Sequence, residues 1–418
     1  MKILLATDAF PPVAGGSGWS TYELARGLRA RGHEVVVFRP RPDTRSGMAE
    51  RVFDGLRVLE VGAPAPAVPF VRNYFRNERL YASLAVVLAG IIEREHVDVV
   101  HGQHVLTCLP SIDAAHRTGR PAVCTIRDYW PVCYWSDLIH TKEGQELCPA
   151  CSTAGMVQCI QPRAGAAWPI ALPMIPYMRR NLARKRRGLA AADAVIAVSS
   201  AIARDLRTRA PELERVRMEI IPNSVDLTEL RARAAASRPR LDGPYVLYLG
   251  KLAPNKGTTH LIRIAQRADL RWPLVIAGNG PERTALEAAA RASDRDIRFA
   301  GWVDRDAATS WLAHATVLVF PSRGPESLSR VLLEATALGV PVAAMNTGGT
   351  ADIVEHGGTG LLSVTPDELA HDVRRLVQDG GLRARLGAAA RESAARFDSP
   401  TVVRRVERLY EELRKAPR

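Results

Sequence analysis

Residues 321–354 read PSRGPESLSRVLLEATALGVPVAAMNTGGTADIV, and this stretch decides the fold class. Glu326 and Glu334 stand eight residues apart, so on one helix they would lie within roughly 80° of the same face. Residues 338–344 (LGVPVAA) follow as a helix stop, a turn and a buried strand. A strand end, a loop with a glutamate, a helix with a second glutamate and another strand are typical of a ligand site above an α/β sheet.

The spacing of the two glutamates also fits an ordinary helix, since two glutamates on one face usually meet solvent. The whole stretch, however, resembles the E-x7-E signature of retaining glycosyltransferases of family 4, which have the two-domain GT-B fold. The resemblance implies that Glu326 contacts the transferred sugar and that Glu334 binds the ribose of the nucleotide. It also implies donor contacts from Leu328 and Ser329, although many relatives have a glycine-bearing loop there, and a pocket closed by residues 348–350 (GGT).

Length and composition bound the class of protein. A chain of 418 residues exceeds one ordinary domain, so two domains are expected. Hydrophobic residues make up 47% and charged residues 24%, which is typical of a soluble globular protein. No apolar run reaches the roughly 18 residues that cross a bilayer. Residues 1–8 (MKILLATD) soon turn polar, so they predict a buried strand and not a signal peptide, and we expect a cytoplasmic protein.

The positive charge suggests an anionic partner. The formal net charge is +13, and between residues 170 and 218 eleven Lys or Arg stand against four Asp or Glu. Residues 168–178 (WPIALPMIPYM) lead into six basic residues at 179–187. This segment either lies peripherally on the anionic inner face of a membrane or packs the apolar side of its helix internally. No recognition motif accompanies the charge, so nucleic acid is not an expected partner.

Strand and helix patterns alternate in two series, which indicates two parallel sheets covered by helices on both faces. The first series has strands expected at 2–6, 34–38, 97–100, 122–126 and 194–198. The second has strands expected at 245–249, 274–277, 297–299, 317–320 and 340–344. We therefore expect an α/β protein of GT-B type, with two doubly wound, Rossmann-like domains facing a central cleft.

The two series also give domain boundaries. We expect an N-terminal acceptor-binding domain at 1–230, with a cysteine-containing insertion at about 130–162. Residues 231–244, rich in Arg, Ala and Ser, predict an exposed linker. A C-terminal nucleotide-sugar-binding domain follows at 245–400. The resemblance implies that the final helix, within 401–418, crosses back to the first domain.

Residues 250–257 (GKLAPNKG) directly follow an expected strand. They resemble the family segment G-R-L-x-x-x-K-G, whose basic residues hold the nucleotide diphosphate. Fixed cations there would lower the barrier, because negative charge builds on the leaving diphosphate. Lys251 and Lys256 are therefore candidate catalytic and donor-binding residues, although two loop lysines can also serve solvation alone. Lys251 replaces the more usual arginine and so loses a bidentate contact.

Glycine-rich turns follow two of the expected strands. Residues 10–18 (FPPVAGGSG) precede a helix, and glycines there allow backbone N–H groups to approach a phosphate. The resemblance implies donor contacts from Gly15 and Gly16 in this turn. It implies further donor contacts from Gly278, in a G-x-G-P turn, and from Val303, beside the nucleotide base.

Histidines stand at the end of the expected strand 97–100, where ligands of open parallel sheets collect. The resemblance implies a histidine near the transferred sugar, which is His104 or, with slightly less support, His101. Either could instead be a buried hydrogen-bonding group. Residues 125–130 (TIRDYW) are similar to the family pattern T-x-H-D-x-W. That similarity makes Asp128 and Arg127 candidate acceptor-binding residues, with Arg127 where a histidine is frequent.

Four cysteines lie within or close to the insertion: Cys133, Cys148, Cys151 and Cys159. Cys148 and Cys151 have the C-x-x-C spacing of zinc sites, and the other two are near enough in sequence to complete four thiolates. A structural zinc, free thiols and disulfides are the alternatives, and disulfides are not favoured in a cytoplasmic enzyme.

The resemblance covers most of the chain and implies a retaining transfer of a sugar from a nucleotide diphosphate sugar. The acceptor would be a glycan, a lipid-linked sugar or a small molecule. No aspartate pair of the D-x-D type is evident, so lysines and helix N-termini would replace a catalytic metal, and no cofactor is expected for catalysis. The rival hypotheses are a nucleotide-sugar-binding protein without transfer activity and an epimerase or phosphorylase of the same fold.

Overall fold

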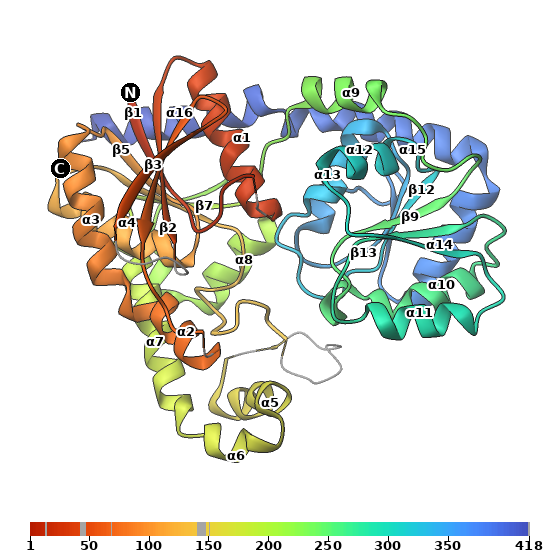
Figure 1. Cartoon of the computed structure of the whole chain (residues 1–418), viewed down its shortest axis with the longest axis horizontal. Helices are drawn as coiled ribbons and strands as arrows, with labels where there is room; N and C mark the ends of the chain where they lie inside the picture. Colours follow the sequence, from red (N-terminus) through yellow and green to blue (C-terminus); the bar gives the residue numbers. More distant parts are fainter. Residues whose placement is uncertain (13–14, 42–46, 68, 140–147, 150, 417–418) are drawn as a thin grey trace.

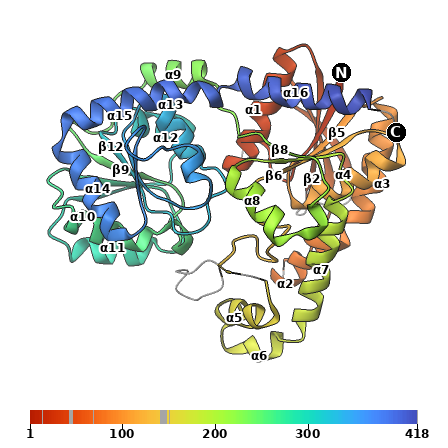
Figure 2. The ribbon, with the colours of Figure 1, turned by 180° about the vertical axis from the view of Figure 1, so that it is seen from behind.

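The computed structural model describes residues 1–12, 15–41, 47–67, 69–139, 148–149 and 151–416. The chain forms two α/β domains side by side, joined along one edge by α9 (Leu227–Ala236) and by the long α16 (Ser399–Lys415) (Figure 1). Each domain has a central sheet between layers of helices, and Figure 2 shows the same arrangement from behind. The expected fold class is confirmed.

The N-terminal sheet has the order β3-β4-β2-β1-β5-β6-β7-β8 in the described part of the chain. Its strands are β1 (Lys2–Ala6), β2 (Glu34–Arg41), β3 (Met48–Phe53), β4 (Leu56–Gly62), β5 (Val99–Gly102), β6 (Ala122–Ile126), β7 (Ala194–Ala197) and β8 (Met218–Ile220). Neighbouring strands pair in parallel, except that β3 pairs antiparallel with β4. Leu4 of β1 lies between Val36 of β2 and Val100 of β5, so β1 has an apolar neighbour on each of its two flanking strands.

Helices connect these strands and extend the domain below the sheet. They are α1 (Gly16–Ala30), α2 (Pro69–Tyr74), the π-helical turn η1 (Phe75–Arg79), α3 (Tyr81–Arg94), α4 (Val105–Arg117), α5 (Thr153–Ala164), α6 (Trp168–Ala171), α7 (Met174–Leu189) and α8 (Ser200–Arg209). In both views α5 and α6 lie away from the sheet, at the N-terminal end of α7, and form a lobe with that end of the helix (Figures 1 and 2). This lobe has its own small core, which includes Tyr134, Met156 and Met178.

The C-terminal sheet is parallel throughout its described strands, with the order β11-β10-β9-β12-β13-β14. Its strands are β9 (Val246–Leu249), β10 (Leu274–Ala277), β11 (Ile297–Gly301), β12 (Val317–Phe320), β13 (Val342–Met345) and β14 (Leu361–Ser363). Its helices are α10 (Leu261–Arg267), α11 (Arg283–Arg291), α12 (Arg305–Ala313), α13 (Arg330–Leu338), α14 (Pro366–Gln378) and α15 (Gly380–Ser393).

The expected linker at 231–244 is helical in its first part, because α9 continues through Ala236, whereas residues 237–244 lie outside helices and strands and none of residues 231–244 is buried. Asp226 caps this helix by accepting a hydrogen bond from the backbone N–H of Glu229 at 2.8 Å. Leu230 is buried, and α9 packs against α12 and α13 of the C-terminal domain. The Arg- and Ala-rich composition that suggested a linker is equally a good helix composition, and tertiary packing decides between the two.

The last helix, α16, completes the core of the first domain. Val402, Val403, Val406, Leu409, Tyr410 and Leu413 are buried in one cluster with Ile3 and Leu5 of β1. Helix α16 also contacts α1 directly. The apolar spacing along α16 therefore covers one face of the N-terminal sheet.

Candidate active site

A cavity of about 1140 Å³ lies between the two domains. Four of its lining residues are Gly16 at the start of α1, Lys251 after β9, Gly278 after β10 and Glu334 on α13. They follow the carboxyl ends of strands or stand on the helices after them, and ligands of doubly wound sheets bind there. The cavity is large enough for a nucleotide sugar.

Six of the expected donor-binding residues line this cavity: Gly15, Gly16, Lys251, Gly278, Val303 and Glu334. Lys251 is exposed and makes no ion pair within the described part of the chain. Helix α1 begins at Gly16, so its N-terminal backbone N–H groups and the Lys251 ammonium both favour an anion here.

The G-x-G-P turn is held by close backbone packing. A Cβ atom on Gly278 would lie 1.8 Å from the carbonyl oxygen of Gly250, and one on Gly280 would lie 2.1 Å from that of Leu252. Gly278 also has φ of +149°, which residues with a side chain rarely adopt. The turn after β10 therefore rests directly on the segment that carries Lys251.

Lys256 and Glu326 form a second charged group in the C-terminal domain. Lys256 Nζ lies 2.5 Å from Oε1 of Glu326, and the hydroxyl of Ser322 donates to the same oxygen. Glu326 is only 8% exposed. It stands in the loop between β12 and α13, so the two glutamates do not share a helix. The buried ion pair keeps the Glu326 carboxylate in one orientation.

The double-glycine turn lies against the backbone of Glu326. A Cβ atom on Gly348 would lie 2.1 Å from the carbonyl oxygen of Glu326, and Gly348 has φ of +53°. The backbone N–H of Gly349 donates to that same carbonyl at 2.6 Å. Only glycine fits so close an approach, and the turn thereby fixes the loop that carries Glu326.

Two other expected donor contacts, Leu328 and Ser329, are buried at 5% and 9% exposure. Leu328 packs into the hydrophobic core. Neither residue is among those that line the interdomain cavity. Any contact of Leu328 with a donor would therefore come from its backbone.

Glu334 is linked to the N-terminal domain through Arg330. Arg330 Nε donates to Oε1 of Glu334 at 2.8 Å, and its Nη2 lies 3.4 Å from Oε1 of Glu23 on α1. Glu23 is fully buried and also pairs with Arg305 of α12 at 2.8 Å. Charged groups of both domains therefore meet beside the cavity.

Nε2 of His104 has no hydrogen-bond partner among the described residues. The backbone N–H of Asp8 points at Nδ1 from 3.3 Å, and a backbone N–H can only donate. Nδ1 is therefore the acceptor, and the neutral ring carries its proton on Nε2. Burial lowers the pKa of His104 to about 3, so the ring is neutral at ordinary pH and Nε2–H is a fixed donor.

His101 is a core residue, so its described contacts favour His104 as the histidine of the site. It is fully buried, with Nδ1 2.5 Å from the hydroxyl of Tyr410 and Nε2 2.7 Å from Oγ1 of Thr125. Both nitrogens are therefore occupied by protein groups, and burial lowers the pKa of His101 well below its ordinary value. His101 lies inside strand β5, whereas His104 follows the strand and caps α4.

Arg127 holds neighbouring loops together. Its Nε donates to Oδ1 of Asn223 at 3.0 Å, and its Nη1 donates to the side chain of Gln103. An acceptor contact of Arg127 stays a prediction.

Asp128 lies near a second carboxylate, Asp8, that the sequence did not single out. Asp8 Oδ1 is buried without a hydrogen-bond partner among the described residues, and Asp8 Oδ2 accepts from the backbone N–H of Leu106 at 3.3 Å. Burial raises the pKa of Asp8 and of Asp128 to about 6 each. Asp8 comes two residues after the end of β1, and this position at a strand end was the signal that could have identified it.

The four cysteines of the lobe gather around one small hollow, which Cys133, Cys148, Cys151 and Cys159 all line. Burial raises the pKa of Cys151 to about 12 and that of Cys159 to about 11. None of the four forms a disulfide in the described structure. In the described residues no group of three or more His, Cys, Asp or Glu is arranged to hold a metal ion. The grouping is as expected, while the zinc stays a prediction.

The basic segment packs its apolar side inward, while four of its six basic residues are exposed: Arg179, Arg180, Arg184 and Arg187. Ile175, Met178 and Leu182 of α7 are buried in the core of the lobe, whereas Ile170 on α6 is 84% exposed. Lys185 is fully buried and donates to Oδ1 of Asn77 at 2.6 Å, and burial lowers its pKa to about 8. The internal packing alternative therefore accounts for most of this segment. No helix in the described part of the chain has the length and apolar character to span a membrane.

Family comparisons agree with this geometry. Residues 14–229 match the model of Glycosyltransferase Family 4, and residues 232–393 match that of Glycosyl transferases group 1. The two matches meet near the start of α9, between the two sheets.

Relatives of similar length include two bacterial enzymes. The chain is 30% identical over 411 residues to D-inositol 3-phosphate glycosyltransferase of Xylanimonas cellulosilytica, covering 92% of this chain and 88% of that one. It is 27% identical over 430 residues to glycogen synthase of Mycobacterium tuberculosis, covering 98% and 94%.

Solved structures share the fold. Sucrose-phosphate synthase from Thermosynechococcus elongatus superimposes with a TM-score of 0.70 at 21% identity, covering 99% of this chain and 98% of that one. Alr3699/HepE of Anabaena, in complex with UDP, gives a TM-score of 0.67 at 18% identity, covering 99% and 100%.

Proposed function

This chain belongs to glycosyltransferase family 4 and is a hexosyltransferase that uses nucleotide sugars, and from this premise we propose how its residues act. The donor binds in the interdomain cavity, with its diphosphate near Lys251 and the N-terminus of α1. Glu334 binds the ribose and Glu326 the transferred sugar. The observation that carries this proposal is the meeting of Lys251, Gly16 and Glu334 around one cavity of about 1140 Å³.

Transfer proceeds with retention of the anomeric configuration in this proposal. As the bond between the sugar and the diphosphate breaks, negative charge grows on the leaving phosphate, and Lys251 and Lys256 stabilise it. The leaving phosphate accepts the proton of the attacking hydroxyl on the same face of the sugar. Neutral His104 donates a hydrogen bond from Nε2 to a sugar hydroxyl and moves no proton, since its pKa is about 3.

The acceptor binds on the N-terminal side of the cleft in this proposal. Asp8, Asp128 and His104 all follow strands β1, β6 and β5 of the N-terminal sheet. A carboxylate there can accept a hydrogen bond from an acceptor hydroxyl. Glycans, lipid-linked sugars and small polyols all carry such hydroxyls.

A transfer assay with radiolabelled donors tests the proposal. The protein is first screened by thermal shift against UDP- and ADP-sugars, and the sugar that stabilises it is then supplied in labelled form. We expect label in a larger product with the anomeric configuration of the donor. Binding without release or transfer would identify a nucleotide-sugar-binding protein, and an altered free nucleotide sugar would identify an epimerase.

Zinc content is the first testable prediction. If Cys133, Cys148, Cys151 and Cys159 close around one metal, purified protein contains about one zinc per chain, and chelation makes residues 130–162 easier to cleave. Metal analysis and limited proteolysis measure the two effects. Cys151→Ser should release the zinc, because a site with three thiolates binds more weakly. Metal-free protein from a preparation without chelators would instead assign free thiols.

Peripheral membrane binding is the second prediction, and the structure makes it weak. Of the six basic residues at 179–187, Lys185 is buried, and Arg184 and Arg186 pair with Glu78 and Glu212. Each remaining arginine contributes about 1 kcal/mol near an anionic surface, so we expect only salt-sensitive binding to anionic vesicles. Co-sedimentation at low and high salt measures it. Equal, negligible binding to anionic and neutral vesicles would leave the internal packing role alone.

A further inference from the structure

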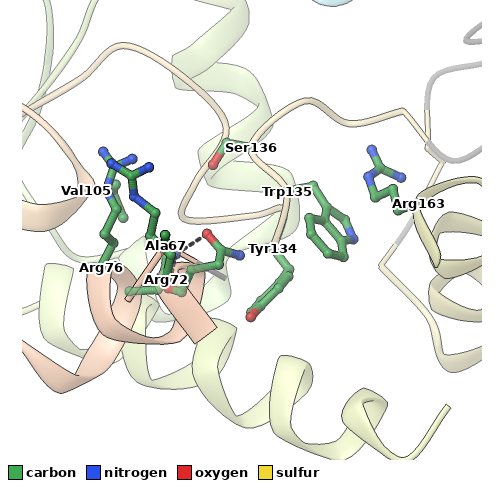
Figure 3. Close-up of a pocket in the computed structure, with 10 residues that line it drawn as sticks. Ala67, Arg72, Arg76, Val105, Tyr134, Trp135, Ser136 and Arg163 are labelled. Atoms are coloured by element: carbon green, nitrogen blue, oxygen red, sulfur yellow. Dashed lines mark hydrogen bonds between the residues drawn. The ribbon is translucent and has the colours of Figure 1, made fainter. Parts of the chain in front are cut away.

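A second cavity, of about 650 Å³, lies within the N-terminal domain and apart from the interdomain cavity. Arg72 of α2 and Arg76 of η1 line one side, and Trp135 and Arg163 line the other (Figure 3). Arg72 and Arg76 stand four residues apart on continuous helical turns, which places both side chains on one face. The residues that line this cavity include three arginines and, within the described part of the chain, no Asp or Glu.

Of the three arginines, Arg72 has no ion pair among the described residues and Arg76 has only a long one. Arg72 is exposed and forms no ion pair with any described residue. Arg76 has Asp8 as its ion-pair partner, at 3.7 Å, and its Nε is buried without a hydrogen-bond partner in the described structure. Arg163, in contrast, pairs with Asp137 at 2.6 Å. A buried guanidinium nitrogen without a partner is costly, and an anion in the cavity would satisfy it.

The opposite wall suits a sugar or polyol ring. Trp135 and Tyr134 line it, and the guanidinium of Arg163 lies 5.0 Å from the Trp135 ring centre. Asn73 and Ser136 add polar groups at the edge of the cavity. Aromatic ring faces beside hydroxyl-binding groups suit a sugar or polyol ring, and the two arginines on the facing wall suit an anionic substituent on that ring.

The cavity shares no lining residue with the interdomain cavity, but it lies beside residues that contact His104. Val105 lines it and directly follows His104, whose Nε2–H is unpartnered within the described structure. Arg76 contacts Asp8, whose backbone N–H holds the His104 ring. A ligand whose phosphate meets Arg76 therefore extends toward the histidine assigned to the sugar.

We propose that this cavity is the acceptor subsite for a phosphorylated sugar or polyol, with Arg72 and Arg76 binding the phosphate. The proposal rests on the proposed function and specifies its acceptor. The phosphate belongs either to a soluble sugar phosphate or to a polyprenyl phosphate-linked acceptor, since both present the same group to the arginines.

Equilibrium binding tests the proposal without requiring turnover. Glucose 6-phosphate and mannose 6-phosphate are compared with glucose and mannose, and polyprenyl phosphate is compared with polyprenol in neutral-lipid vesicles. We expect the wild-type protein to bind at least one phosphorylated probe tenfold or more tightly than its unphosphorylated counterpart. The soluble or the lipid probe that binds identifies the source of the phosphate.

Variants assign that binding to the two arginines. Arg72→Gln and Arg76→Gln should each weaken the phosphorylated probe at least tenfold, and Arg76→Lys should recover part of the loss. Arg180→Gln, an exposed arginine on α7 outside the cavity, is the matched control for charge and should leave binding unchanged. Thermal unfolding and UDP binding report whether each variant is folded.

Two results would overturn the subsite. One is that no phosphorylated probe binds the wild-type protein better than its counterpart, and the other is that both glutamine variants bind as tightly as wild type. If UDP still binds in either case, only the subsite fails. If neither UDP nor ADP binds the folded wild-type protein, the donor site assigned under the proposed function fails instead.

Discussion

Replacing Lys256 or Lys251 with alanine is expected to lower kcat by about 100-fold or more. Lys251 lines the interdomain cavity, and Lys256 pairs with Glu326 at 2.5 Å. In the proposed arrangement each loss removes a cation near the charge that develops on the leaving diphosphate. For Lys256→Ala a second effect adds to the first, because the buried Glu326 carboxylate loses its counter-charge.

Steady-state kinetics over a range of donor concentrations up to saturation give kcat and KM separately for each variant. Lys415→Ala removes an exposed ammonium at the end of α16 and serves as the control for net charge. A loss confined to KM, with kcat preserved, would mean that the lysines bind the ground state of the donor alone.

Glu334→Ala is expected to weaken nucleotide binding by roughly 10- to 150-fold, the value of one hydrogen bond to a charged group. The same change leaves Arg330 Nε without its acceptor at 2.8 Å. Glu326→Ala should chiefly reduce turnover, because that carboxylate faces the transferred sugar in the proposed arrangement. Calorimetry with UDP and turnover assays divide these effects between the two variants.

A nearby substitution keeps this prediction specific. Glu411→Ala removes an exposed carboxylate of α16, so it should change neither UDP affinity nor turnover. Arg330→Gln should reproduce part of the Glu334→Ala loss, because the carboxylate then lacks its orienting partner. Two glutamate variants that are folded and kinetically normal would reject the donor-site assignment.

The positions of the central strands along the chain could be predicted from the sequence because each is a short apolar run. Residues 274–277 (LVIA) and 317–320 (VLVF) are buried throughout, so their apolar composition directly indicates buried strands. The strand Met48–Phe53 at the edge was missed, because most of its residues are exposed and its pattern is mixed. Edge strands give a weaker hydrophobic signal for this physical reason.

The choice between His101 and His104 could not be made from the sequence. The two stand three residues apart at one strand end, and local pattern treats them alike. What separates them is Tyr410, which reaches Nδ1 of His101 from 309 residues further along the chain. A contact of that kind depends on how α16 crosses the molecule, and no spacing near His101 records it.

The contacts among the charged groups beside the cavity could not be predicted from the sequence either. The E-x7-E pattern pointed to Glu334, but it did not show that Arg330 connects this residue to Glu23 of the other domain. Each of these side chains is unremarkable in its own helix. Their meaning comes from the contact between Arg330 of α13 and Glu23 of α1, which only the folded chain displays.

The path of α16 has a consequence for how the protein is made. A ribosome delivers residues 1–230 first, yet the apolar face that β1 offers to Val403 and Tyr410 waits for a helix near the end of the chain. The first domain thus emerges with uncovered apolar surface while the second domain, whose strands follow one another closely in sequence, can fold as it appears. Docking of α16 is therefore the event that closes the first domain, and a chain truncated before residue 399 is expected to leave the apolar face of β1 uncovered.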